Sequence, residues 1–65
     1  DVKISIFDLL GSEVVVLSSE RKSSGKYDIR WQGTDRFGKS VSSGTYFVVL
    51  EALNSRKIQK ILFIK

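Results

Sequence analysis

The sequence of 65 residues contains no cysteine, histidine, methionine or proline. It therefore lacks the thiol and imidazole groups on which common zinc sites, thiol chemistry and histidine-dependent general base catalysis depend. No disulfide reinforces the fold, and a chain this short supports one hydrophobic core at most. No apolar run approaches the roughly 20 residues that cross a bilayer, and no secretory signal pattern is present. These absences predict one small non-enzymatic domain with no cofactor, no metal site and no membrane insertion.

The residues that are present favour strands over helices. Seven valines and six isoleucines stand beside a single alanine, and β-branched side chains pack well on a pleated sheet. Ten serines and five glycines supply residues for turns. The formal net charge of +4 is modest and dispersed along the chain. We therefore expect a solvated surface and no nucleic acid partner.

Alternation of apolar and polar residues predicts strands separated by polar loops. The alternation is clearest before Gly33, where Tyr27, Ile29 and Trp31 share one face. Four consecutive apolar residues, 14–17, break the pattern and predict a bulge or a strand covered on both faces. Strands at such short spacing, with no helix between them, predict an antiparallel sandwich or small barrel. The predicted strands are 2–7, 13–18, 26–32, 45–52 and 57–64, with Val41 as a short further strand or a plug.

The same alternation predicts the core. Tyr27, Ile29 and Trp31 are expected to lie mostly buried on one face, with large aromatic side chains supplying much of the apolar area. Lys3 and Ser5 are assigned to the polar face of the first strand. The residues expected to face Trp31 are Val2, Ile4, Ile6, Tyr46, Val48 and Leu50.

The charged residues do not predict a catalytic or metal site. General acid–base catalysis needs two carboxylates held across one substrate, whereas Asp28, Asp35 and Glu51 lie in separate predicted elements. A calcium site takes about six to eight oxygen ligands, and the segment around Asp35 supplies one carboxylate. Gly33 and Gly38 precede no predicted helix, which argues against a phosphate-binding loop. We interpret Asp35 as a residue whose side chain orders a tight turn.

Four segments carry a resemblance to a known family. They are VKISIFDLLG (2–11), WQGTDRFGK (31–39), SGTYF (43–47) and KILFIK (60–65). In this order they resemble the C-terminal sorting domains of type IX secretion system cargo proteins. They equally resemble the related immunoglobulin-like domain of the flagellar hook-capping protein. The resemblance implies a small immunoglobulin-like antiparallel β-sandwich of about six strands, without the first strand that family members usually have.

The resemblance to sorting domains implies that the domain acts as a sorting signal for export. Residues 1–65 would form a single C-terminal domain of a larger protein that passes through the periplasm to the cell surface or the medium. The partners implied are the outer-membrane secretion machinery and a sortase-like peptidase. Two alternatives remain open. One is a structural accessory domain, as in the hook-capping protein or at the tail of an enzyme, and the other is a surface filament or adhesin subunit.

Four residues are candidates for recognition by such partners: Gly44, Tyr46, Lys60 and Lys65. Gly44 and Tyr46 either begin a strand whose tyrosine packs inward or belong to the surface that export machinery reads. Lys60 and Lys65 flank an apolar terminal strand. They either keep an edge strand soluble or form a terminal recognition element. An open strand edge would also allow self-association.

Overall fold

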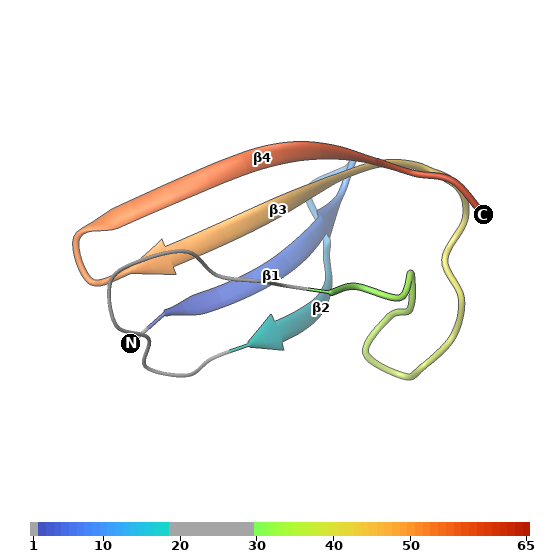
Figure 1. The fold of residues 1–65 in the computed structure, drawn as a ribbon, viewed down its shortest axis with the longest axis horizontal. Coiled ribbons are helices and arrows are strands. Elements are labelled where there is room, and N and C mark those ends of the chain that lie inside the picture. Colours follow the sequence, from blue (N-terminus) through green and yellow to red (C-terminus); the bar gives the residue numbers. More distant parts are fainter. Residues whose placement is uncertain (1, 19–29) are drawn as a thin grey trace.

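The computed structural model describes residues 2–18 and 30–65 (Figure 1). These residues form one four-stranded antiparallel sheet and contain no helix. The strand order is β2-β1-β3-β4. The strands are β1 (Lys3–Asp8), β2 (Glu13–Ser18), β3 (Gly44–Ala52) and β4 (Ser55–Phe63). The predicted all-β antiparallel architecture is confirmed, with four strands in the described residues in place of about six.

Four of the predicted strands match β1 to β4 to within two residues at each end. The predicted strand over 26–32 does not continue through residues 30–32, which have no strand geometry. The cause is local, because the Trp31 Nε1 group donates a hydrogen bond to the Thr34 carbonyl oxygen at 2.9 Å and Gly33 turns the chain with a φ of 72°. Tyr27 and Ile29 lie outside the described residues. Val41 belongs to no strand.

β1 is an inner strand of the sheet, paired with both β2 and β3. Its register with β3 is regular, from Lys3 opposite Glu51 to Asp8 opposite Tyr46. Its register with β2 shifts twice, once between Ile4 and Ser5 and once between Ile6 and Phe7. Each shift leaves an extra residue on β2, which confirms the bulge predicted from the apolar run 14–17.

The core face of the sheet consists of side chains that share one side of β1 and β3, because residues opposite each other in an antiparallel pair point the same way. Ile4 and Ile6 are completely buried on this face. Val2 and Tyr46 are also buried, as predicted, and Trp31 is half-buried. The strand residues of the core face are Ile4, Ile6, Tyr46, Val48 and Leu50.

The second face of the sheet is less polar than alternation predicts. Ser5 was expected on a solvated face, yet its side chain is completely buried, and its neighbour Val49 is 2% exposed. Lys3 lies two residues before Ser5 on β1, and Glu13 of β2 lies opposite Phe7, two residues after Ser5. An ion pair connects Lys3 Nζ to Glu13 Oε2 at 3.4 Å. The strand residues of the second face include Lys3, Ser5, Phe7, Phe47, Val49, Ile58, Lys60 and Leu62.

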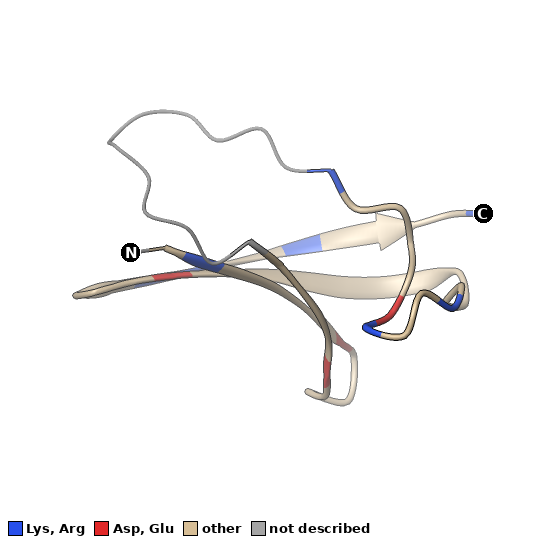
Figure 2. Ribbon diagram, turned by 90° about the horizontal axis from the view of Figure 1, so that it is seen from below, with Lys and Arg blue, Asp and Glu red and all other residues tan. Residues whose placement is uncertain are grey.

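The segment 33–40 packs beside the turn that joins β1 to β2. Seen edge-on in Figure 2, the sheet bends at this end, and the segment lies next to the bend. The Arg36 backbone N–H donates to the Val14 carbonyl oxygen at 3.1 Å, and an Arg36 guanidinium nitrogen donates to the Glu13 carbonyl oxygen at 2.7 Å. These contacts connect the segment to β2.

Candidate functional site

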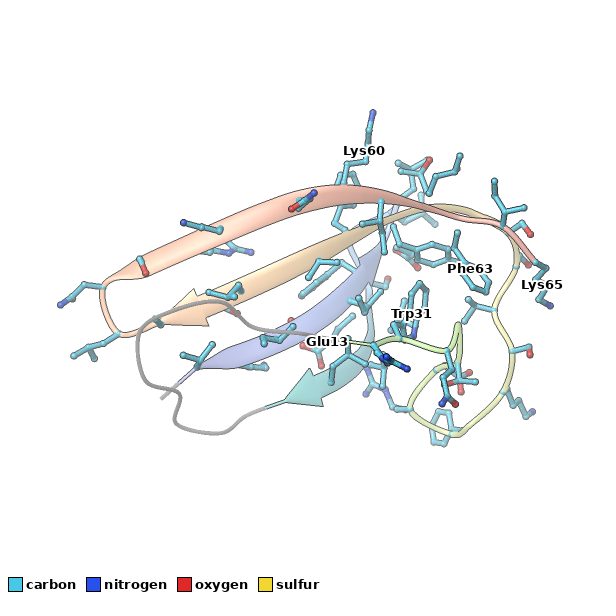
Figure 3. All side chains as sticks on the ribbon, in the orientation of Figure 1. Glu13, Trp31, Lys60, Phe63 and Lys65 are labelled. Carbon is cyan, nitrogen blue, oxygen red and sulfur yellow. The ribbon has the colours of Figure 1, made fainter. Side chains whose placement is uncertain are left out.

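An aromatic cluster of Trp31, Tyr46 and Phe63 joins three parts of the chain at the end of the sheet. The ring centroids of Trp31 lie 5.0 Å from Tyr46 and 5.1 Å from Phe63, and those of Tyr46 and Phe63 lie 6.4 Å apart. Figure 3 shows Trp31 beside Phe63, near the point where β4 ends. Aromatic pairs at these separations contribute about 0.5–1.5 kcal/mol each beyond their buried area. The cluster therefore fixes the segment after Trp31 against β3 and β4.

Gly33 lies directly against the ring of Phe63. A Cβ atom built on Gly33 would overlap three atoms of that ring, and the residue is buried. Its φ of 72° also lies in the left-handed region, which costs other residues about 1–2 kcal/mol. Both the contact and the backbone angle therefore require glycine at this position.

Hydrogen bonds anchor the loop that follows the cluster. The Val41 N–H donates to the Gly33 carbonyl oxygen at 2.9 Å. An isolated antiparallel β-bridge between Thr34 and Ser40 also connects the two sides of the loop. The hydroxyl of Tyr46 donates to the Ser42 carbonyl oxygen at 2.7 Å. Gly33 and Tyr46, which both pack beside Phe63, therefore also hold the backbone on the two sides of the loop.

Asp35 orders the tip of this loop, as predicted. Its Oδ1 atom accepts hydrogen bonds from the N–H groups of Phe37 and Lys39 at 2.9 and 3.0 Å. Its carbonyl oxygen accepts from the Gly38 N–H, and its own N–H donates to the Lys39 carbonyl oxygen. Gly38 has a φ of 81°, which the turn requires.

Asp8 builds an equivalent turn between β1 and β2. Its Oδ1 atom accepts from the N–H groups of Leu10 and Ser12 at 3.0 and 2.9 Å, its N–H donates to the Ser12 carbonyl oxygen, and Gly11 has a φ of 88°. The predicted strands 2–7 and 13–18 leave a short connection here, but sequence reasoning missed that this turn and the Asp35 turn are alike. The shared spacing, Asp8 to Gly11 and Asp35 to Gly38, was the pattern that could have revealed it.

A shallow pocket of about 380 Å³ lies between these two turns and the start of β2. An Arg36 guanidinium nitrogen lies 3.9 Å from Glu13 Oε1 at its rim. Asp8 and Asp35 both use Oδ1 to bind backbone amides, so these carboxylates order the loops that form the pocket. The lining residues are Asp8, Glu13, Val14, Asp35, Arg36, Phe37, Val41 and Tyr46.

Neither a metal-ion cluster nor a membrane-spanning helix is present in the described residues. Within 2–18 and 30–65, no group of three or more histidine, cysteine, aspartate or glutamate residues is placed to hold a metal ion. In the same ranges, no helix has the length and apolar character needed to cross a membrane.

The four predicted recognition residues do not form one cluster. Tyr46 packs inward in the aromatic cluster, and Gly44, with a φ of 159° close to extended backbone, lies opposite Phe63 at the start of β3. Lys60 is exposed on β4, and Lys65 is exposed beyond the end of β4, where its N–H donates to Ser43 Oγ at 3.0 Å. Figure 3 shows the two lysines well separated. Their role in recognition stays a prediction.

The fold and its packing define a small all-β domain built around an antiparallel sheet. A family model for the FlgD Ig-like domain matches residues 1–56, and the chain belongs to that family of immunoglobulin-like domains. The match agrees with the hook-capping half of the resemblance seen in the sequence and does not extend to the type IX sorting domains. No curated protein and no solved structure matched the chain.

Proposed function

We propose that this chain is a non-catalytic structural accessory domain of a larger protein, which holds neighbouring protein parts in fixed positions. The observation that carries the proposal is the match of residues 1–56 to the FlgD Ig-like domain. Because a fold alone does not define a function, the packing of the site provides the second support.

The packing suits a rigid module better than an active site. The aromatic cluster, Gly33 and the hydrogen bond from Tyr46 to Ser42 tie the 31–42 segment to the sheet. The Asp8 and Asp35 carboxylates are used to satisfy backbone amides in their turns. A module held in this way presents surfaces of constant shape, which is what a structural domain needs.

The test uses the parent protein, which is the larger protein that contains this chain as a domain. Deletion of residues 1–65 should leave the turnover of any catalytic region unchanged per folded molecule, but should prevent the parent from assembling into its normal complex. Assembly is measured by size-exclusion chromatography with light scattering, and turnover on the same samples. Lower turnover with normal assembly would place chemistry in this domain and overturn the proposal.

A second proposal is that the domain acts as a type IX sorting signal. Outer-membrane machinery and a sortase-like peptidase would bind it while the protein passes to the cell surface or the medium. The observation that favours it is the exposed basic end of the chain, with Lys60 and Lys65 both accessible. Export of a periplasmic reporter fused to the domain is the test. Deleting residues 60–65 is a poor variant, because it removes Phe63 from the aromatic cluster. Lys60→Gln with Lys65→Gln leaves the cluster intact, and unchanged export in this variant would argue against recognition of the lysines.

A further inference from the structure

In the part of the chain that the structure describes, the outer edge of β4 is unpaired along its length. In the order β2-β1-β3-β4, β4 pairs with β3 on one side, and no other described strand pairs with its outer side. Its nine residues are mostly exposed. Such an edge leaves a row of backbone N–H and C=O groups free to bind another strand.

The charge of this edge has one sign. Residues 52–65 contain four of the eleven basic residues of the chain and none of its seven acidic residues. Arg56 lies opposite Glu51 of β3, but Lys57 lies opposite Leu50 and Lys60 opposite Phe47. The two lysines of β4 therefore face no acidic side chain in the adjacent strand.

On the second face of β4, apolar side chains alternate with Arg56 and Lys60. Ile58 is 57% exposed and Leu62 is 68% exposed, and they flank Lys60 on its side of the strand. One known role of lysines on an edge strand is to prevent pairing with another strand. Exposed isoleucine and leucine beside them work against that purpose, because they add apolar area that an incoming strand would bury.

We propose that the outer edge of β4 binds an extended strand that carries acidic side chains, by adding it to the sheet. Backbone hydrogen bonds would supply the pairing, and carboxylates opposite Arg56, Lys57 and Lys60 would set its register. Apolar residues of the added strand would cover Ile58 and Leu62. The inference rests on the proposed structural function, because it names the surface through which such a domain contacts a partner.

The probe is a fluorescein-labelled peptide designed for antiparallel addition, Val-Val-Glu-Thr-Val-Glu-Glu. It places valine opposite Leu62 and Ile58 and glutamate opposite Lys60, Lys57 and Arg56. Fluorescence anisotropy with the 65-residue chain should show saturable binding that weakens as salt is added. The same peptide with lysine in place of glutamate should not bind.

Backbone methylation separates strand addition from simple charge attraction. Two further peptides carry N-methyl groups on either the odd or the even residues. Since alternate amides of a strand point to opposite sides, only one of the two should lose binding. Equal binding of both methylated peptides would show that charge attraction, and not strand pairing, holds the probe.

Variants of the chain locate the site. Lys57→Gln with Lys60→Gln should weaken binding by about two- to fivefold for each lysine, as expected for exposed ion pairs. Lys39→Gln is the matched control, because Lys39 is also exposed but lies on the Asp35 turn. Far-UV circular dichroism confirms that each variant is folded.

Four outcomes would overturn the inference. They are no binding by the folded chain, equal binding of both methylated peptides, equal weakening by Lys39→Gln, and a stable dimer of the chain that the peptide fails to dissociate, which would make a second copy the occupant of the edge. None of these outcomes bears on the parent assembly test, so a failure here is distinguishable from a failure of the proposed function.

Discussion

Replacing Gly33 with alanine should destabilise the domain far more than the same change at Gly38. Both glycines have positive φ values, 72° and 81°, so each substitution carries about 1–2 kcal/mol of backbone cost. Only at Gly33 does the added Cβ overlap the ring of Phe63, whereas at Gly38 it meets no atom within 4 Å. Overpacking of this kind adds about 1–3 kcal/mol. We therefore expect a loss of about 2–5 kcal/mol for Gly33→Ala and about 1–2 kcal/mol for Gly38→Ala.

Urea unfolding followed by the fluorescence of Trp31, the single tryptophan, measures both values. Because domains of this size are only marginally stable, a stabilising osmolyte is added equally to every sample. The reduced freedom of the unfolded chain affects both alanine variants alike and cancels in the comparison. Phe63→Leu in the Gly33→Ala background should restore part of the loss, because the smaller side chain makes room for the methyl group. Equal losses at Gly33 and Gly38 would refute the packing of Gly33 against Phe63.

Five further substitutions, at four positions, test individual contacts by the same unfolding assay. Trp31→Ala should cost about 3–5 kcal/mol, measured by circular dichroism because the fluorophore is lost. Tyr46→Phe removes the hydrogen bond to the Ser42 carbonyl oxygen and should cost about 1 kcal/mol. Asp35→Ala should cost about 1–2 kcal/mol, whereas Asp35→Asn, which keeps the accepting oxygen, should cost less. Ser5→Ala should raise stability by about 1 kcal/mol, since the buried Ser5 Oγ has no hydrogen-bond partner among the described residues, and a loss would show that this hydroxyl is paired.

Alternation in the sequence was sufficient to predict β1 and β3, because Ile4, Ile6 and Tyr46 lie buried on the core face. β4 was also predicted, although its Ile58 and Leu62 are exposed. Alternation failed at Ser5, which is completely buried opposite Val49 although the pattern places it on the polar face. It also failed at Trp31, where a hydrogen bond to Thr34 and the turn at Gly33 override the alternation. Contacts between distant or irregular segments leave no period in the sequence.

The candidate site was predicted in part. Turn chemistry gave the role of Asp35, because an aspartate bonds to amides only a few residues away and needs no tertiary information. The packing of Gly33 against Phe63 could not be predicted, since it depends on how the end of β4 meets a loop 30 residues earlier. The separation of Lys60 from Lys65 also depends on where β4 ends.

The central claim is that residues 31–33 pack on the end of the sheet and lock the domain into a rigid module. Nuclear Overhauser contacts in the 65-residue chain test it most directly. We predict contacts from the Gly33 α protons to the Phe63 ring and from the Trp31 indole to the Tyr46 ring, with the Gly33 α protons shifted by the nearby aromatic ring. Contacts between β1 and β3 without any between Gly33 and Phe63 would show a sheet that the loop does not lock, and would contradict the account.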